Sequence, residues 1–567
     1  MTAESLTSPA KTGTAFINVA GLTAELDDGT KIVEDVSFSV APGEILGIIG
    51  ESGSGKTTTS LALLGYATPG VTLAGRVEVS GRNLLELTPA QLRAVRGLEI
   101  AYVPQDPPSA LNPSMRVAKL INSMLAAHAG RDQSSSGIGA ALSRVDLPTD
   151  RDFIRRFPHQ LSGGQQQRLA IGAALAARPG AVVFDEPTTG LDLLTQALIV
   201  REIRSLRDEL GVAMVYVSHD LRVVADLADR VCVMHRGRIV ETGDARTVLQ
   251  DPQHEYTKSL VAAIPSHRAR IDAPEPVASR PPSTVSVTGP AQPQGRGAAA
   301  DTQLHSQGDV LTVQGLQAGY RSRGTYVPIL RNVDLRIGVG ERVAIAGQSG
   351  SGKTTLTRCI SGLVDANGGT ITFDGQNLPL RYKDRSTEQL RSIQVVFQNP
   401  TLSLNPALTV NEIVGRPIQL RRGGRRAANA DEVRRYLDLV ELDASAAARR
   451  PRELSGGQRQ RVMIASALAA EPKLLICDEI TSALDVSVQA KILRMLKTLS
   501  QELQLALLFV SHDLGVITSI AQRTAVIHSG EILEDKPTAD LISSPEFEYT
   551  RQLIAAADEL ESFTTRS

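Results

Sequence analysis

The stretch Gly50-Glu51-Ser52-Gly53-Ser54-Gly55-Lys56-Thr57-Thr58 decides the fold of this chain. It has the spacing glycine, four residues, Gly-Lys-Thr. The apolar run Ile45-Leu46-Gly47-Ile48-Ile49 precedes it and predicts a buried strand, and Thr59-Ser60-Leu61-Ala62-Leu63-Leu64 comes after it and is compatible with a helix. A strand, a glycine-rich loop and a helix in this order form a cradle for phosphate, because the glycines leave backbone N–H groups free to surround an anion.

The polar residues of this loop have expected tasks. Lys56 is expected to reach the β- and γ-phosphates of a nucleotide, and the Thr57 hydroxyl to ligate Mg²⁺. The other expected binding positions are Gly50, Ser52, Gly53, Ser54, Gly55 and Thr58. The pattern returns as Gly347-Gln348-Ser349-Gly350-Ser351-Gly352-Lys353-Thr354-Thr355, which makes a chance Gly-Ser loop the weaker interpretation. The second set comprises Gly347, Ser349, Gly350, Ser351, Gly352, Lys353, Thr354 and Thr355, with Thr354 as the metal ligand.

The rest of the chain is duplicated as well. Phe16-Ile17-Asn18-Val19-Ala20-Gly21-Leu22 resembles Val310-Leu311-Thr312-Val313-Gln314-Gly315-Leu316, and most motifs downstream of each recur in the same order. A chain of 567 residues is expected to form several domains. We predict a disordered tail at 1–14, one domain at 15–265, a flexible linker at 266–309 that is rich in Pro, Ser, Ala and Gly, and a second domain at 310–567.

Short apolar runs alternate with helix-like stretches in each copy, which predicts an α/β domain with a parallel sheet covered on both faces. Between residues 87 and 178 the pattern is mainly helical. The further strands are expected at 17–19, 36–40, 77–79, 181–184, 213–217 and 231–234 in copy one, and at 474–477, 507–510 and 525–527 in copy two.

Composition narrows the range of possible functions. The apolar content of 42% is ample for a large core, and the net charge of -1 gives no overall basic field for nucleic acid. Cys232, Cys359 and Cys477 have no metal-binding spacing and are expected to be buried free thiols in a reducing cytosol. No apolar run approaches the roughly 18 residues that span a bilayer, and residues 1–14 lack the apolar centre of a signal peptide.

Two acidic pairs come directly after predicted strands. Asp185-Glu186 succeeds Val182-Val183-Phe184, and Asp478-Glu479 succeeds Leu475-Ile476-Cys477. The carboxyl end of such a strand is where an open α/β sheet binds ligand. Asp185 and Asp478 are therefore expected to hold Mg²⁺, and Glu186 and Glu479 to act as general bases on the attacking water. A solvated acidic pair at a strand end is the alternative.

Each copy has a second predicted anion site. Leu161-Ser162-Gly163-Gly164-Gln165 and Leu454-Ser455-Gly456-Gly457-Gln458 both lead into a helix. Serine is a favoured N-cap, and the glycines expose backbone N–H groups. A plain helix cap is the alternative. The expected nucleotide contacts are Ser162, Gly163, Gly164 and Gln165, and Ser455, Gly456, Gly457 and Gln458.

The order of these motifs resembles that of an ABC-family ATPase domain. Copy one has the glycine loop, Gln105, Leu-Ser-Gly-Gly-Gln, Asp185-Glu186, Leu191-Asp192 and His219. Copy two has the same series with Gln398, Leu484-Asp485 and His512. The resemblance covers nearly the whole chain except the tail and linker. It implies two P-loop domains, each with a mostly parallel core sheet, an antiparallel β subdomain and a helical subdomain.

The resemblance also implies how the domains work together. They would pair head to tail around two ATP molecules, the loop of one copy facing the Ser-Gly-Gly-Gln of the other. Gln105 and Gln398 resemble glutamines that touch Mg²⁺ and water and sense the transporter. His219 and His512 resemble histidines that contact the γ-phosphate; a surface residue at a strand end is the alternative for each. Both copies keep the Lys, Glu and His of the pattern, so both sites are expected to hydrolyse ATP.

Two positions depart from the pattern. Tyr320 stands where the family usually stacks an aromatic ring on adenine, and copy one has Leu26 there. Site one is thus expected to hold the base more weakly, since stacking on a base contributes about 1–3 kcal/mol in single-strand nucleic-acid complexes; an ordinary strand aromatic is the alternative. Ile480 replaces the proline found at Pro187, which is expected to change loop stiffness.

Finer features resemble the peptide/nickel importer subfamily. These are the Leu-Asn-Pro after each glutamine, at 111–113 and 404–406, and the ends His254-Glu255-Tyr256-Thr257-Lys258-Ser259-Leu260 and Phe547-Glu548-Tyr549-Thr550-Arg551-Gln552-Leu553. They imply the ATPase subunit of an importer for oligopeptides, dipeptides, nickel chelates or glutathione. Two integral-membrane permeases would dock near residues 106–130 and 399–425, an extracytoplasmic solute-binding protein would deliver the cargo, and the chain would lie at the cytoplasmic face of the membrane.

Other functions are less favoured. A soluble tandem ABC protein acting on ribosomes or nucleic acid usually has a charged helical linker, basic extensions or zinc-binding cysteines, which this sequence lacks. An ATP-binding module without hydrolysis is disfavoured by Glu186 and Glu479. An exporter is a further alternative, since the ATPase motifs alone do not set direction, but the Leu-Asn-Pro resemblance favours import. Some relatives carry a cysteine cluster near the C-terminus that holds an iron–sulfur centre. This sequence lacks that cluster, so no iron–sulfur cofactor is inferred.

Overall fold

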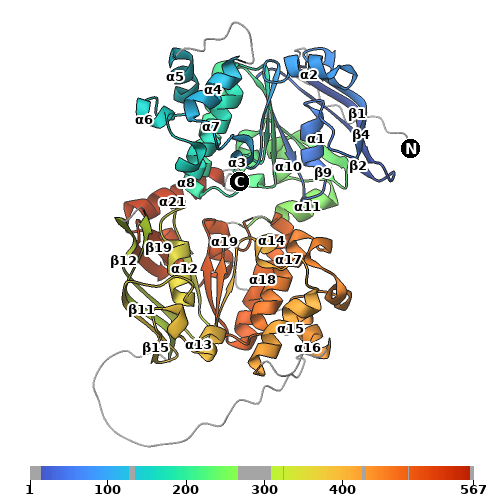
Figure 1. Cartoon of the computed structure of the whole chain (residues 1–567). Helices are drawn as coiled ribbons and strands as arrows, with labels where there is room; N and C mark the ends of the chain where they lie inside the picture. The colour runs from blue at the N-terminus through green and yellow to red at the C-terminus, as the bar shows by residue number, and fades with distance from the viewer. Residues whose placement is uncertain are drawn as a thin grey trace, which may run out of the picture.

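The computed structural model describes residues 15–126, 135–265, 308–322, 325–423, 430–482 and 484–561. They form two domains that lie one above the other in Figure 1, the first coloured blue to green and the second yellow to red. The tail at 1–14 and residues 266–307 of the linker lie outside the described residues. The duplicated sequence folds into two copies of the same arrangement.

Each domain is built on a six-stranded sheet in which all strands but the edge strand β10 or β20 run parallel. The order is β10-β9-β3-β8-β7-β6 in domain one and β16-β17-β18-β13-β19-β20 in domain two. Every residue of β3 and β13 is buried because both faces of the sheet are covered, in domain one by helices on one face and by the antiparallel sheet with α1 on the other. This confirms the predicted α/β class. The strands are β3 (Ile45–Ile49), β6 (Ile100–Val103), β7 (Ala181–Asp185), β8 (Ala213–Ser218), β9 (Arg230–His235), β10 (Arg238–Asp244), β13 (Arg342–Ala346), β16 (Ile393–Val396), β17 (Leu474–Asp478), β18 (Ala506–Val510), β19 (Arg523–His528) and β20 (Glu531–Pro537).

A separate antiparallel sheet lies beside the phosphate loop of each domain, with the order β2-β1-β4-β5 or β12-β11-β14-β15. Its inward side chains alternate along the strands, as in Ile17 and Val19 and, after a bulge, in Leu22 and Ala24, and pack on one face of the parallel sheet. The strands are β1 (Ile17–Leu26), β2 (Lys31–Val40), β4 (Val71–Val79), β5 (Arg82–Asn83), β11 (Asp309–Ser322), β12 (Thr325–Gly338), β14 (Gly368–Phe373) and β15 (Gln376–Asn377).

Helices cover the sheets and form a helical subdomain in each copy. The stretch 87–178 is mainly helical as expected, but it also holds strand β6, which was not predicted because its four residues give too short an apolar run. The helices of domain one are α1 (Lys56–Ala62), α2 (Pro89–Val95), α3 (Pro107–Ala110), α4 (Val117–Ala126), α5 (Ser135–Ser143), α6 (Arg151–Ile154), α7 (Gly163–Leu175), α8 (Leu193–Leu210), α9 (Leu221–Leu227), α10 (Ala245–Gln250) and α11 (Glu255–Ala262). Those of domain two are α12 (Lys353–Ser361), α13 (Thr387–Ser392), α14 (Pro400–Ser403), α15 (Val410–Arg421), α16 (Ala430–Leu439), α17 (Gly456–Leu468), α18 (Val486–Leu503), α19 (Leu514–Ile520), α20 (Thr538–Ser543) and α21 (Glu548–Leu560).

One hydrophobic cluster spans both domains. Helix α21 of domain two lies against α8 of domain one (Figure 1), and its Leu553 and Leu560 belong to the same buried cluster as Ile203 of α8. Arg201 Nε and Glu559 Oε1, 3.1 Å apart, form an ion pair across the boundary. In the equivalent place, α11 of domain one contacts α18 of domain two. Apolar burial therefore holds the domains together at this point.

The cysteines and the membrane-spanning potential can also be compared with expectation. The three cysteines are buried and unpaired, as predicted. In the part of the chain that the structure describes, no helix combines the length and the apolar character needed to cross a membrane.

Candidate nucleotide-binding sites

The first phosphate loop joins β3 to α1, and only glycine fits at its first and last positions. Gly50 has a φ of 153°, and a Cβ there would lie 2.2 Å from the carbonyl oxygen of Met234. Gly55, the N-cap of α1, has a φ of 99°. In domain two a Cβ at Gly347 would lie 2.3 Å from Ile527 O. The glycines let the loop pass close to a neighbouring strand and turn its N–H groups toward the helix N-terminus.

The loop lysines are buried and bond to backbone carbonyls of their own loops. Lys56 is 5% exposed, and its Nζ donates to Gly50 O at 2.7 Å and Glu51 O at 2.9 Å. Burial lowers the pKa of Lys56, although the charges of Glu186 and Asp485 oppose that shift. Lys353 makes the equivalent bonds in domain two. Each ammonium group can bind a phosphate by giving up its two hydrogen bonds to carbonyl oxygens of the loop.

The structure brings most predicted residues of site one around one cavity of about 240 Å³. Its lining residues are Ile32, Ser52, Gly53, Gly55, Lys56, Thr57, Thr58, Gln105, Glu186, Thr189, His219, Leu484 and Asp485. Ser54 lies beside it, and its buried Oγ has no hydrogen-bond partner among the described residues; the same holds for Ser351 in the second loop. A buried hydroxyl without a partner in each loop fits a phosphate ligand.

The predicted metal ligands also come together. Asp185 ends β7, and Tyr102 OH donates to its Oδ2 at 2.9 Å. Burial raises the pKa of Asp185, and the nearby Thr57 hydroxyl opposes that rise. Burial and the neighbouring charge of Glu479 raise the pKa of Asp478 to about 6. A buried carboxylate of this kind gains from a nearby cation.

An ion at these carboxylates would need further oxygen ligands. Within the described residues no group of three or more His, Cys, Asp or Glu side chains could hold a metal ion by itself. Mg²⁺ in nucleotide enzymes is held by one or two carboxylates together with phosphate oxygens. The pair Asp185 with Thr57 therefore fits an ion that arrives with the nucleotide, and Asp478 with Thr354 stays the predicted counterpart in domain two.

Glu186 is the centre of the hydrogen-bond network in site one. Its Oε2 accepts from Gln105 Nε2 at 2.8 Å and Thr189 Oγ1 at 3.1 Å, and lies 3.1 Å from His219 Nδ1. Burial acts to raise the pKa of Glu186, but His219 and Lys56 outweigh it and the pKa is lowered. The backbone at Glu186 has a φ of 49°, an uncommon conformation that fixes the direction of its side chain. The glutamate is ionised and held by its neighbours.

The same residues meet in site two. Gln398 Nε2 donates to Glu479 Oε2 at 3.0 Å, and Glu479 also has a φ of 49°. His512 Nδ1 lies 3.7 Å from Glu479 Oε1, further than its counterpart in site one. The predicted catalytic groups are thus assembled in both domains, with a looser histidine contact in domain two.

The Ser-Gly-Gly-Gln segments cap helices. Ser162 Oγ accepts from Gln165 N at 3.3 Å, and Gln165 Oε1 accepts from Ser162 N at 3.1 Å, which is a capping box at the start of α7. Ser455 and Gln458 do the same for α17. A Cβ at Gly164 would lie 2.5 Å from Thr195 Cγ2, so this glycine also permits close packing of α7 on α8.

The expected pairing of each phosphate loop with the opposite Ser-Gly-Gly-Gln stays a prediction. Residues 455–458 are not among the described residues that line the cavity of site one. Domain two instead reaches this loop through Asp485, whose Oδ1 accepts from Ser52 N at 2.6 Å, and through Ser487, whose hydroxyl donates to the Glu51 carboxylate. Asp485 is the N-cap of α18, and Ser487 lies in the first turn of this helix.

Tyr320 lies near the end of β11 with 42% of its surface exposed, and Leu26 ends β1 half-buried. Exposure leaves the Tyr320 ring available for a base, as the resemblance implies. Ile480 and Pro187 are both buried beside the catalytic glutamates. The stacking role and the effect on loop stiffness stay predictions.

Sequence reasoning missed two tyrosines that contact the phosphate loops. Tyr256 OH, on α11, accepts from Glu51 N at 3.0 Å, and Tyr549 OH, on α21, accepts from Gln348 N at 2.8 Å. Each ring also packs against a histidine, His235 at 4.0 Å or His528 at 4.1 Å between ring centroids. The repeated Glu-Tyr-Thr was the available signal, but sequence spacing could not show that it folds back onto the loop.

Comparison with protein families agrees with this geometry. The family described as ABC transporter matches residues 33–189 and 330–482. The family described as Oligopeptide/dipeptide transporter, C-terminal region, matches residues 240–289. Each ABC match runs from the antiparallel sheet to the loop after the catalytic glutamate, so it contains both the phosphate loop and the acidic pair.

Relatives match over nearly the full length. The Peptidoglycan transport ATP-binding protein YejF of Agrobacterium fabrum is 37% identical over 551 residues, covering 94% of each chain. The Glutathione import ATP-binding protein GsiA of Salmonella paratyphi A is 37% identical over 559 residues, covering 95% of this chain and 89% of its own. An archaeal ribosome recycling factor, aABCE1, solved with the ribosomal stalk protein aP1, is similar in fold, with a TM-score of 0.57 at 20% identity over 91% of this chain and 90% of that chain.

The fold and the sites define an ATPase with two P-loop domains fused in one polypeptide. This chain belongs to the ABC transporter family. It is an ATP-binding protein that hydrolyses ATP, as the two families and the relatives indicate.

Proposed function

We propose that this chain is the ATPase subunit of an importer for oligopeptides, dipeptides or related small solutes such as nickel chelates and glutathione. The observation that carries the proposal is the match of residues 240–289 to the oligopeptide/dipeptide transporter C-terminal region. The names of two relatives, one of peptidoglycan transport and one of glutathione import, fall in the same range of peptide-like solutes.

The proposed partners are two integral-membrane permeases and an extracytoplasmic solute-binding protein, with no nucleic acid. The chain would lie at the cytoplasmic face of the cell membrane, bound through the permeases. The segments expected to dock them, 106–130 and 399–425, support this; of these, 127–130 and 424–425 lie outside the described residues. Their apolar side chains Met124, Leu402 and Leu420 are 43%, 84% and 52% exposed. Exposed apolar groups in these two segments are suited to a partner surface.

The residues proposed to act in each site are chosen from the geometry. Lys56 and the loop N–H groups would bind the phosphates, and Asp185 with Thr57 would hold Mg²⁺, which neutralises phosphate charge when bound. Glu186, ionised and aligned by its neighbours, would take the proton of the attacking water. His219 would contact the γ-phosphate while keeping its bond to Glu186. Lys353, Asp478, Glu479 and His512 are the counterparts in site two.

The proposed cycle has three steps. Nucleotide binding draws the domains together until each Ser-Gly-Gly-Gln segment completes the opposite site. Closure moves the docked permeases, and hydrolysis lets the sites reopen. The apolar contact between α8 and α21 offers a place where the domains can stay joined while the sites open.

Co-expression with candidate permeases tests the proposal. We expect the chain to purify with two multi-span permeases and to drive ATP-dependent uptake of one member of a panel of labelled peptides, nickel chelates and glutathione. Leu402→Asp should reduce assembly, while Val339→Asp, at a 57% exposed position outside both docking segments, should not. Sedimentation with ribosomes and no permease binding would contradict the proposal.

A further inference from the structure

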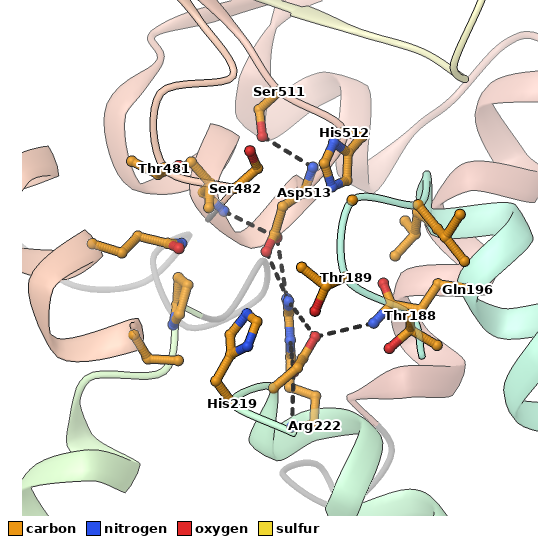
Figure 2. A pocket seen from close by; sticks show the side chains of 18 of the residues that line it. Thr188, Thr189, Gln196, His219, Arg222, Thr481, Ser482, Ser511, His512 and Asp513 are labelled. Atoms are coloured by element: carbon orange, nitrogen blue, oxygen red, sulfur yellow. Dashed lines mark hydrogen bonds and ion pairs between the residues drawn. The ribbon is translucent and has the colours of Figure 1, made fainter. Parts of the chain in front are cut away.

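One arginine of domain one joins the loops that carry the two catalytic histidines (Figure 2). Arg222 lies in the first turn of α9, just after His219. Its Nη1 donates to Asp513 Oδ1 at 3.1 Å and its Nη2 to Asp513 Oδ2 at 2.7 Å. Asp513 comes directly after His512. A bidentate pair therefore crosses the domain boundary beside both histidines, and such planar pairs fix geometry as well as charge.

The same guanidinium also holds the aspartate next to the other histidine. Nε of Arg222 donates to Asp220 Oδ1 at 3.1 Å and Nη2 to Asp220 Oδ2 at 3.2 Å. Only 12% of the Arg222 side chain and 18% of each aspartate side chain is exposed. One further carboxylate, Glu561, lies 3.8 Å from Nη1. Charges this poorly solvated hold one another in place, because a buried ion left without its partner is costly.

Each aspartate is rigidly tied to its own histidine loop. Asp513 Oδ1 accepts from Gly515 N at 2.8 Å and caps α19, and Asp513 N donates to Ser511 Oγ at 3.0 Å. Asp220 caps α9 in the same way and bonds to Ser218. A shift of either aspartate must therefore carry its histidine loop with it.

The contact is asymmetric by sequence. Ser218-His219-Asp220-Leu221-Arg222 corresponds to Ser511-His512-Asp513-Leu514-Gly515. A Cβ at Gly515 would lie 2.5 Å from the carbonyl oxygen of Pro265, near the end of domain one. A second arginine would have to displace that backbone. The guanidinium of Arg222 thus binds the aspartates of both loops.

We propose that Arg222 is a positioning residue that couples the two ATP sites by making the His219 and His512 loops move as one unit. Nucleotide at one site then changes the placement of the histidine at the other. The proposal rests on the ATPase activity of the family and is independent of the cargo and the permeases.

Asp513→Asn tests this coupling in the full chain. Asparagine keeps Oδ1 and can still cap α19, but it removes the negative charge opposite Arg222. ATPase rate is measured against ATP concentration, with and without Glu479→Gln to silence site two. In the parent chain we expect a Hill coefficient above 1 and a loss of well over half of the turnover with Glu479→Gln. With Asp513→Asn we expect a Hill coefficient near 1. Adding Glu479→Gln to this variant should leave about half of its turnover, as for independent sites.

Asp226→Asn is the matched control. It removes the acid of the Arg204–Asp226 pair, 2.6 Å long, which lies within domain one. It should leave the Hill coefficient unchanged. Arg222→Lys keeps the charge but loses the bidentate geometry, and it serves as the second variant if Asp513→Asn does not fold. A Hill coefficient of 1 in the parent chain overturns the proposal, and so does a Hill coefficient that is the same in the parent, Asp513→Asn and Arg222→Lys. A drop of the Hill coefficient in Asp226→Asn equal to that in Asp513→Asn overturns it too.

Discussion

The backbone N–H of Ser52 in the first phosphate loop donates a 2.6 Å hydrogen bond to Asp485 Oδ1 of the other domain. The equivalent aspartate of domain one, Asp192, instead accepts from the backbone and side chain of Thr195 at the start of α8. Domain two has Val488 in place of Thr195 and so lacks the side-chain donor. Asp485, which does not cap α18 with its side chain, is therefore available to the opposite loop.

This difference predicts unequal nucleotide binding by the two sites. Asp485 places an anion in the phosphate cavity and uses one loop N–H, so Asp485→Ala should tighten ATP binding at site one by roughly 2- to 10-fold, in line with one or two screened interactions. Calorimetric titration with each site silenced in turn measures the effect. Asp192→Ala is the matched variant and should change site two less. Weaker binding after Asp485→Ala would contradict the prediction.

The tyrosines behind the loops predict a change in substrate affinity. Tyr256→Phe and Tyr549→Phe each remove the acceptor for one loop N–H and should raise KM for ATP about 2- to 10-fold with little change in kcat, since a neutral hydrogen bond contributes about 0.5–1.5 kcal/mol. Steady-state ATPase assays check this. Tyr382→Phe, at a position 52% exposed and away from the loops, is the control. An unchanged KM in both loop variants would show that the contact does not shape the sites.

The catalytic glutamates predict a separation of binding from turnover. Glu186→Gln and Glu479→Gln keep a side chain of the same size but remove the base, so the double variant should lose about 10²- to 10⁴-fold in kcat while still binding ATP. Phosphate release and nucleotide titration measure the two properties. If the double variant kept full activity, the assignment of the general bases would be wrong.

Glu202 on α8 predicts how stability depends on pH. Burial raises its pKa to about 7, opposed by Arg168, whose Nη1 is 3.7 Å away. Neither of its carboxylate oxygens has a hydrogen-bond partner among the described residues. A folded-state pKa above the ordinary value of 4.5 means that stability is fully present below that value and is lost as pH rises toward about 7.

Glu202→Gln should therefore flatten the stability profile between about pH 4.5 and 7 and stabilise the chain by about 1–3 kcal/mol at pH 8. Denaturant unfolding at a series of pH values provides the measurement. Glu255→Gln, at an exposed ion pair on α11, is the control and should change little. A parallel pH profile in the parent and Glu202→Gln would contradict the assigned pKa.

Local pattern determined the fold class and the parts of each site. The spacing of Gly50 to Thr57 requires a strand, a tight loop and a helix, and the repeat at Gly347 gave the second domain. The acidic pair at Asp185 and Glu186 was also predictable, because its position at a strand end is a local property. Four-residue β6 was too short to give such a signal.

Tertiary structure alone decided which residues meet across the chain. Tyr256 reaches the phosphate loop only because α11 folds back over it, and Arg222 meets Asp513 only because one hydrophobic cluster spans both domains. Asp485 is available to Ser52 because Val488 has no hydroxyl to donate to it. Periodicity and spacing describe neighbours within one element, whereas contacts between distant elements depend on how their apolar faces pack, and that is fixed only when the whole chain folds.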